Sequence, residues 1–589
     1  MKKTALQVAP FFYFFISLLS CLLMIFPNSD LTIGRWALQI DEQILFDQLK
    51  KIYHFDSKEQ LIRFFYDGGW PSYGPIFFNI NAIVCILPKI FFGDPGIIFT
   101  GRMSGVFFII ISLILLTMTF LKNWALRAFC FLVLINIPGI NYFMCNPKPE
   151  PIQLFFLSLF FYFFKKNKFC LSKSYWIFLG ISFGAKISAL PFLILVPTCA
   201  IYFVSFDQSL NDAMEHIPKT IFFILLGLII SVPFLFTNYI LCLMIFVFIK
   251  YVLLGNKKED SFLDVILIFG IISFNILIIA ILHNFFHFHS EASSWFLNTF
   301  LSTKHPADHN SINFFSWVNY FFTTWLGSSI FFNLLFLITS FFIVVKGVKD
   351  FFKNNQLDKS NYIALVILSS GLFSIIILFA KVSRLWSFYL TPWIICIIIG
   401  VFSLLEMEYE NNNPKSKIVN HIILKRILFI TFIFSTVGIT KNWITNNYMY
   451  YKDFSSRTKS ENFKKNKQSY LTIIDFLEEQ YDDKGYPITV AYDSFLPIPD
   501  KNYKFYTHRF FEPFEKWDTG YEAIILSERI LKRVQQKPDS EAYEYNELQN
   551  EKTGYEKYVL NNVKECIHKQ CYKKHKDLEN GGVILLRTY

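Results

Sequence analysis

The chain has 589 residues, of which 53% are hydrophobic and 72 are phenylalanine, and its formal net charge is +11. Its mean hydropathy is +0.38. Apolar runs of about 20 residues, long enough to cross a bilayer as a helix, recur from Phe11 to Ile439, and no soluble domain needs so much apolar surface. The composition therefore predicts a polytopic α-helical membrane protein. Because the basic residues cluster beside the apolar runs, the positive charge does not indicate nucleic-acid binding.

The first apolar run, 11–26, follows Met1-Lys2-Lys3 and resembles the start of a signal peptide. No small-x-small cleavage site follows it, so we expect a retained signal-anchor with its N-terminus in the cytoplasm.

Loops rich in lysine and arginine face the cytoplasm, and they orient the remaining spans. These loops contain Lys2-Lys3, Lys122 with Arg127, Lys165-Lys166 with Lys168, Lys257-Lys258, Lys346 with Lys349 and Lys353, and Lys415 with Lys417. The first outer loop is then 27–99, and its apolar stretch 73–92, interrupted by Pro75 and Pro88, is predicted to lie in the membrane interface. The further predicted spans are 98–121, 125–144, 151–164, 262–282, 328–345, 362–380, 388–405 and 422–439.

Two apolar runs between Tyr175 and Lys250 are too long for one upright span each and short for two. Gly184, Pro191 and Pro233 are positioned to break them into hairpins. The total is therefore about 11 or 13 spans, and either number leaves the C-terminus outside. This transmembrane domain is predicted to occupy 1–440.

The composition changes to charged, tyrosine-rich and soluble from about Lys441, which predicts a small extracytoplasmic α/β domain over 441–589. An amphipathic helix is expected at 470–481 and a second helix at 527–534. Strands are expected at 488–492, 523–526 and 583–586. Cys566 and Cys571 fit either a disulfide or two free thiols on a helix.

An acidic pair, Asp41-Glu42, follows the first span. The apolar spacing within 40–49 predicts a short helix on the membrane surface with the two acids near its N-terminus, where the helix dipole favours charged carboxylates. A carboxylate there suits a general base that activates an acceptor hydroxyl. The alternative is that acids are simply common in the first turn of a helix.

A second acid and two cations are predicted on the same side of the membrane, and a third cation lies within an apolar run. Glu150 lies in a proline-rich segment, 146–151, where it is a second site residue or a helix-capping residue. Arg102 opens a span and Arg384 occupies an outer loop. Lys186 lies inside an apolar run, where a charge costs about 2.5–3.5 kcal/mol, so it either snorkels or meets an anion. Cations so placed suit a lipid phosphate or ordinary headgroups.

The outer loop 283–325 contains five histidines, including His287 and His289, but no cysteine or acidic partner at ligand spacing accompanies them, so no metal ligand is assigned. Trp70, Tyr73 and Trp317 suit an aromatic belt or sugar stacking.

In sequence order, these features resemble the GT-C superfamily of polyprenyl-phosphate-dependent glycosyltransferases, with the protein O-mannosyltransferases and the lipid A aminoarabinose transferases as the nearest likenesses. The resembling segments are Asp41-Glu42, 68–75, Gly101-Arg102-Met103-Ser104, Lys148-Pro149-Glu150, 180–186, Arg384 through Tyr389 to Pro392, and 520–527.

The resemblance implies that Asp41 is the catalytic base. The second acid of these families is usually aspartate, and the corresponding residue here is Glu150, whose role stays open. The expected substrate-binding residues are Glu42, Tyr73, Arg102, Lys186, Arg384 and Tyr389. The family fold favours about 13 spans. A divalent cation is left open, because some members use one.

The predicted activity is inverting transfer of a sugar from an undecaprenyl- or dolichyl-phosphate carrier to a hydroxyl of lipid A, another envelope glycan or a protein on the extracytoplasmic face. The alternative from another class is a transporter or flippase of a lipid-linked glycan. An envelope glycan ligase or polymerase is a third hypothesis. The exposed loops contain no Asn-x-Ser/Thr acceptor, which favours a bacterial inner membrane.

Overall fold

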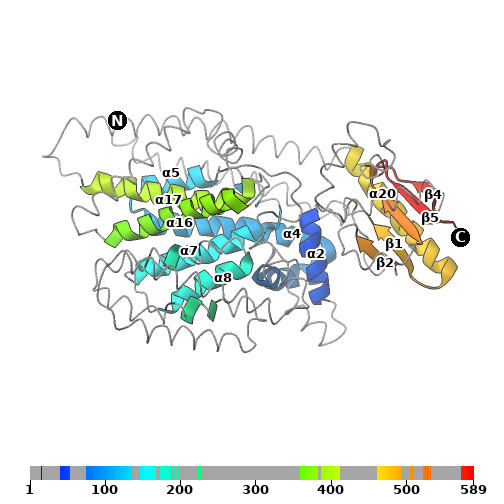
Figure 1. The fold of residues 1–589 in the computed structure, drawn as a ribbon, viewed down its shortest axis with the longest axis horizontal. Helices are drawn as coiled ribbons and strands as arrows, with labels where there is room; N and C mark the ends of the chain where they lie inside the picture. The colour runs from blue at the N-terminus through cyan, green and yellow to red at the C-terminus, as the bar shows by residue number, and fades with distance from the viewer. Residues whose placement is uncertain are drawn as a thin grey trace.

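The computed structural model describes residues 40–53, 75–135, 146–167, 173–186, 359–381, 387–411, 461–492, 505–509, 522–528 and 572–588, with isolated positions between them. In these ranges the chain is a bundle of long helices with a small sheet near its C-terminus (Figure 1). The predicted spans at 11–26, 262–282, 328–345 and 422–439 lie outside the described ranges, apart from Phe15.

Helix α4 (Pro75–Phe120) consists of two helical arms that follow each other directly in the chain and fold back on each other at a non-helical residue, Gly93. In a straight helix Asn81 and Ser104 would lie about 35 Å apart, but Ser104 Oγ is 2.7 Å from Asn81 Oδ1. Likewise the Cys85 thiol lies 3.8 Å from the carbonyl oxygen of Ile97. The turn falls at Gly93, whose φ of 63° and ψ of −142° suit glycine far better than any other residue. Helix α4 is therefore a hairpin of two arms.

The two arms, 75–92 and 94–120, agree with the prediction of two separate helices, at 73–92 and at 98–121. They approach closely because Gly96 has no side chain: a Cβ there would lie 2.3 Å from the Pro88 carbonyl oxygen. The location of the first arm at the membrane interface stays a prediction. Within the described residues, Ile76–Phe120 is the one helix long and apolar enough to cross a membrane.

The second arm of α4 packs against α7 (Glu150–Lys166), and α7 packs in turn against α8 (Ile177–Ala185), which follows the short 3-10 turn η3 (Ser174–Trp176). Helices α16 (Lys359–Lys381) and α17 (Ser387–Asn411) pack against each other on the opposite side of α4 (Figure 1). The contact between them is close at Gly400, where a Cβ would lie 2.7 Å from the Leu368 Cβ.

Three of these helices lie where the sequence predicts spans. Helix α7 covers the span predicted at 151–164, and α16 and α17 cover those at 362–380 and 388–405. The span predicted at 125–144 is interrupted, because α5 (Trp124–Ile135) ends at Ile135, and Ile140 and Phe143 are helical again. The physical reason is Pro138, which disfavours the helical conformation before it, and Gly139 then takes a φ of 96°.

Two of the basic segments predicted to be cytoplasmic, those of Lys122 with Arg127 and of Lys165-Lys166, come together at one end of the bundle. Lys165 donates from Nζ to the Thr119 carbonyl, and Arg127 Nε donates to the Leu121 carbonyl at 2.7 Å. Both cations therefore satisfy carbonyl groups at the C-terminal end of α4, where the helix dipole favours positive charge. Glu406 of α17 accepts the backbone N–H of Lys122 at 2.8 Å and ties the same end to α17.

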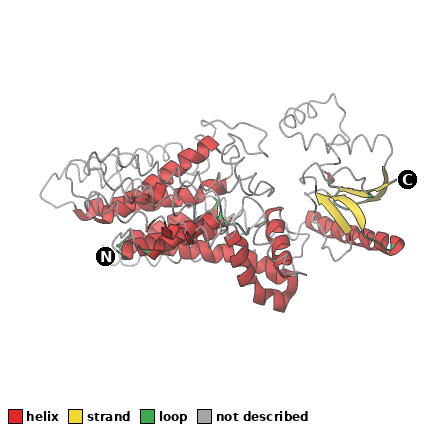
Figure 2. Ribbon diagram, turned by 60° about the horizontal axis from the view of Figure 1, so that its bottom comes forward, coloured by secondary structure: helices red, strands yellow, loops and turns green. Residues whose placement is uncertain are grey.

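The C-terminal domain is a five-stranded mixed sheet with strand order β2-β1-β3-β5-β4. Strands β1 (Ile488–Tyr492), β2 (Phe505–Arg509) and β3 (Ala523–Leu526) are parallel, whereas β4 (Tyr572–Asp577) and β5 (Val583–Arg587) are antiparallel neighbours at the other edge. Helix α20 (Glu461–Lys484) lies along one face of this sheet, as Figure 2 shows. Its Ile473, Phe476 and Leu477 pack against the buried residues of β1, β3 and β5.

The structure confirms the strands predicted at 488–492, 523–526 and 583–586. The helix predicted at 470–481 is longer, and Glu528 and Leu531 are helical within the one predicted at 527–534. The edge strands β2 and β4 are not among the strands predicted from the sequence. Strand β4 reads Tyr-Lys-Lys-His-Lys-Asp and is exposed over five residues, so it lacks the apolar alternation that identifies a half-buried strand.

Candidate functional site

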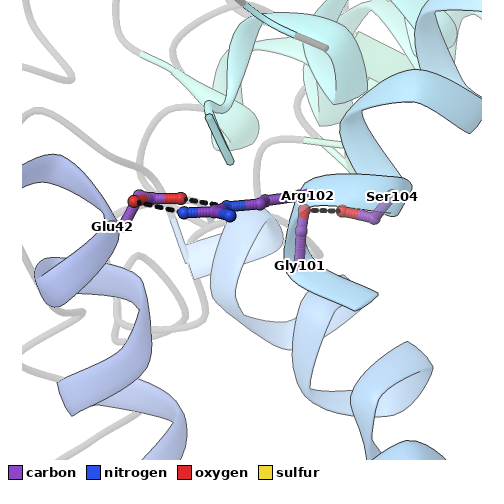
Figure 3. Close-up of polar contacts among 4 residues, drawn as sticks. All are labelled: Glu42, Gly101, Arg102 and Ser104. Carbon is purple, nitrogen blue, oxygen red and sulfur yellow. Dashed lines mark hydrogen bonds and ion pairs between the residues drawn. The ribbon is translucent and has the colours of Figure 1, made fainter. Parts of the chain in front are cut away.

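The first component of the candidate site is a buried ion pair between α2 (Ile40–Tyr53) and α4. Arg102 Nε lies 2.6 Å from Glu42 Oε1, and its Nη2 lies 3.0 Å from Glu42 Oε2 (Figure 3). Glu42 is 3% exposed and Arg102 is 4% exposed. Two parallel bonds from a planar guanidinium to a carboxylate fix orientation as well as distance. The pair therefore fastens α2 to α4 beside Asp41, the residue before Glu42.

Two glycines on α4 let other segments approach this ion pair. A Cβ on Gly101 would lie 3.2 Å from Leu45 Cδ2 of α2 and 3.9 Å from Pro147 Cβ. A Cβ on Gly105, one turn further, would lie 2.5 Å from the Phe143 carbonyl oxygen. Small residues four apart allow such close packing between membrane helices. Three segments that are distant in the sequence, around 42–45, 101–105 and 143–147, therefore meet at one end of the bundle.

The second component is an ion pair between Lys186 and Glu150, which the fold brings together from 36 residues apart. Glu150 is the first residue of α7, where its charge is stabilised by the helix dipole, and the prolines at 149 and 151 are tolerated because the first turn has no intrahelical N–H bonds. Helix α8 ends at Ala185, and Lys186 is extended with φ −157° and ψ 136°. This break near Gly184 agrees with the predicted interruption of the long apolar run.

Lys186 therefore meets an anion, one of the two alternatives that its place in an apolar run left open. It is 4% exposed and Glu150 is 2% exposed, so neither group is solvated. Gln153, one turn along α7, donates from Nε2 to the Lys186 carbonyl at 3.3 Å. In the described part of the chain, Glu150 Oε2 and Gln153 Oε1 are buried without a hydrogen-bond partner.

The remaining predicted site residues are described less fully or not at all. Asp41 belongs to α2 and Tyr389 to α17, but the structure describes neither side chain. Tyr73 and Arg384 lie outside the described residues, as do the histidines of 283–325 and both cysteines of the polar tail. The assignment of these residues to a site stays a prediction.

Two buried polar residues near the site, Asn81 and Gln153, are not among the predicted site residues. Asn81 is 0% exposed in the first arm of α4, where its Nδ2 donates to the Phe77 carbonyl at 2.8 Å and its Oδ1 receives Ser104. Gln153 is 0% exposed in α7. Gln153 was detectable as an isolated amide within an apolar segment, and Asn81 as one of two nearby asparagines in another; a polar side chain in such a segment faces the interior of the bundle rather than lipid.

The described carboxylates do not fit a divalent-cation site. Both carboxylate oxygens of Glu42 accept hydrogen bonds from Arg102, and one carboxylate oxygen of Glu150 pairs with the Lys186 ammonium. Among the described residues there is no group of three or more histidine, cysteine, aspartate or glutamate side chains able to hold a metal ion.

Comparison with known proteins finds likenesses among solved structures but no match among sequences. No protein-family model and no curated protein sequence matches the chain. Among solved structures, it is similar to the oligosaccharyltransferase of Archaeoglobus fulgidus, crystallised with Zn and sulfate, at a TM-score of 0.42 and 11% identity. The likeness covers 81% of this chain and 60% of that enzyme, so this chain spans well under two thirds of its length. At this degree of similarity the likeness carries no conclusion about chemistry.

Proposed function

We propose that the chain is an integral membrane glycosyltransferase that moves a sugar from a polyprenyl-phosphate carrier to an acceptor hydroxyl on the extracytoplasmic face. The observation that carries this proposal is the meeting of two acidic segments at one end of an apolar bundle. The acids of α2 and the first residue of α7 each accompany a buried cation there, Arg102 and Lys186.

The dimensions of the bundle support a membrane location with this end outside. Eighteen residues separate Arg102 from Phe120 along α4, which corresponds to about 27 Å of helix, close to the thickness of a bilayer core. The basic residues Lys122, Arg127 and Lys165 lie beyond Phe120 at the opposite end. Positively charged ends face the cytoplasm, so the end with the two ion pairs faces outward.

In the proposed mechanism, Asp41 accepts the proton of the acceptor hydroxyl. The hydroxyl oxygen attacks the anomeric carbon from the face opposite the phosphate, and the carbon–oxygen bond to the phosphate breaks. The polyprenyl phosphate leaves with the bonding electrons, and the anomeric centre is inverted. A phosphate needs little protonation to leave, so one base is sufficient, whereas a glycosidase also needs an acid.

The cations take different roles in this mechanism. Arg102 and Glu42 together carry no net charge, so we propose that their main role is to position α2 and thereby Asp41. The pair of Lys186 and Glu150 is likewise neutral and lines the site. Arg384, predicted in an outer loop, is then the main cation that stabilises the departing phosphate. Tyr73 and Tyr389 are proposed as further substrate contacts.

The test is mass spectrometry of carrier lipids and envelope glycans in a deletion strain complemented with wild type or with Asp41→Asn. We expect a polyprenyl-phosphate sugar to accumulate in the deletion strain and in the variant, while one glycan or protein lacks a single sugar. The Asp41→Asn protein should reach the membrane in wild-type amounts, which serves as the control for folding. Full rescue by Asp41→Asn would remove Asp41 from the chemistry and favour a flippase, which needs no base.

A further inference from the structure

A group of three polar residues on α7 and α8, which we call the α7 corner, is buried but incompletely hydrogen-bonded. It consists of Glu150, Gln153 and Lys186, which are 2%, 0% and 4% exposed. Glu150 and Gln153 are three residues apart on α7, so both side chains lie on the same face, one turn apart.

Two oxygen atoms of the α7 corner, Glu150 Oε2 and Gln153 Oε1, have no hydrogen-bond partner in the part of the chain that the structure describes. The other polar atom of each side chain is hydrogen-bonded: Glu150 Oε1 accepts a hydrogen bond from Lys186 Nζ, and Gln153 Nε2 donates one to the Lys186 carbonyl. Buried polar atoms in native proteins are almost always satisfied, so two neighbouring exceptions indicate a site that something else fills. Whatever fills it must donate hydrogen bonds, because both atoms are acceptors.

The charge of the α7 corner narrows the class of ligand further. The Glu150 carboxylate is balanced by the Lys186 ammonium, so the corner has no net charge to attract a second cation. A phosphate at neutral pH presents acceptor oxygens, which two carbonyl-type acceptors repel. Neutral hydroxyl groups donate one hydrogen bond each and bring no charge, and adjacent hydroxyls on a sugar ring are close enough together to meet two acceptors one helical turn apart.

We propose that Glu150 and Gln153 bind hydroxyl groups of the sugar moiety, and that Gln153 is a specificity-determining residue that distinguishes a sugar-bearing carrier from the bare carrier phosphate. The inference rests on the proposed function, because it assigns the sugar subsite of the same site. It also gives a reason for product release: the spent carrier has lost the hydroxyl groups that satisfied the α7 corner.

The experiment measures binding by the purified full chain in lipid nanodiscs. The probes are undecaprenyl phosphate and undecaprenyl phosphate carrying glucose, galactose or mannose. Wild type should bind at least one sugar-bearing lipid several-fold more tightly than undecaprenyl phosphate. Gln153→Leu should weaken binding of that lipid about 3- to 10-fold, the effect of one hydrogen bond, and leave undecaprenyl phosphate unchanged.

Ser158→Ala is the matched control. Ser158 is also buried on α7, but its Oγ donates to the Phe155 carbonyl of the same helix at 2.7 Å. We expect this variant to bind all four lipids like wild type.

Two results would overturn the inference. One is wild type binding the bare phosphate as tightly as every sugar-bearing lipid, a comparison that needs no variant and so holds even if Gln153→Leu does not fold. The other is Gln153→Leu losing affinity for all the lipids equally. Failure of the proposed function would give a different result. Sugar-dependent binding and its dependence on Gln153 would persist, but no sugar would be transferred from the carrier to any acceptor.

Discussion

Removing the carboxylate charge of Glu42 should destabilise the protein strongly, because its partner Arg102 is buried. Glu42→Gln preserves the shape of the side chain but takes the counter-charge from a guanidinium that is only 4% exposed. Removing one member of a buried ion pair costs about 3–5 kcal/mol. Since glutamine retains one acceptor oxygen for the guanidinium, we expect a loss at the lower end of that range, about 3 kcal/mol.

Replacing both members of the pair tests whether the penalty comes from the buried charge. Glu42→Leu with Arg102→Met removes both charges and fills a similar volume, and such replacements are often neutral or stabilising by about 1–4 kcal/mol. The double variant should therefore be at least as stable as wild type, whereas Glu42→Gln and Arg102→Met should each be much less stable.

The assay is the temperature at which half of the detergent-solubilised chain is lost from the monodisperse peak after heating at a fixed rate, since membrane proteins often unfold irreversibly. The control is Lys574→Gln, which removes a pair whose side chains are 59% and 68% exposed; such pairs contribute at most about 1 kcal/mol. The reasoning is refuted if Glu42→Gln loses stability no more than this control. It is also refuted if the double variant is as unstable as the two single variants combined.

Two further substitutions follow from local geometry. Gly105→Ala should lower the same thermal midpoint far more than Gly101→Ala. The new Cβ at residue 105 would lie 2.5 Å from the rigid Phe143 carbonyl oxygen, whereas a Cβ at residue 101 would lie 3.2 Å from the flexible Leu45 side chain. Equal midpoints for the two variants would contradict this packing. In the C-terminal domain, burial alone would raise the pKa of Glu522, but hydrogen bonds, chiefly from Lys484 at 2.8 Å, outweigh it and lower the pKa below its ordinary value of 4.5. A carboxyl whose pKa is lowered on folding stabilises the folded state above its unfolded pKa and loses that contribution as pH falls. The protection factors of the β3 amides, which are exchange rates corrected for the intrinsic pH dependence of exchange, should therefore fall below about pH 4.5 in wild type and much less in Glu522→Gln, and identical pH profiles of the protection factors would refute the assignment.

The sequence determined the helices with strong local signals. Helix α7 (Glu150–Lys166) contains the whole predicted span 151–164 and extends it by one residue at the start and two at the end. Prolines and Glu150 mark its first turn and two lysines mark its last, which matches the polarity of the helix dipole. The buried strands β1 and β3 were equally predictable, because each is a short apolar run in the sequence. Where the local signal was weaker the prediction was incomplete: it contained neither the interruption after α5 within the span 125–144 nor the polar edge strand β4.

The sequence also supplied the residues of the candidate site but not their partners. It predicted Glu42, Glu150 and Arg102 on the same side of the membrane, because alternating apolar spans and basic loops fix the side on which each loop lies, and it predicted Lys186 within an apolar run. Which acid meets which cation depends on helix packing, which brings residues 60 and 36 positions apart into contact. Only the tertiary structure decided that Arg102 holds the α2 acid and that Lys186 holds the α7 acid.

The unsatisfied oxygens of the α7 corner depend on tertiary structure even more directly. Whether a buried atom has a partner depends on every group that packs around it, and no local pattern encodes that. Gln153 was visible in the sequence as an isolated amide in an apolar helix. Apolar periodicity and charge thus determined that this chain is a helical bundle with a small α/β domain and acids near one end of the bundle. Burial and close packing at Gly101 and Gly105 decided which of those polar groups neutralise one another and which oxygens are left to bind a ligand.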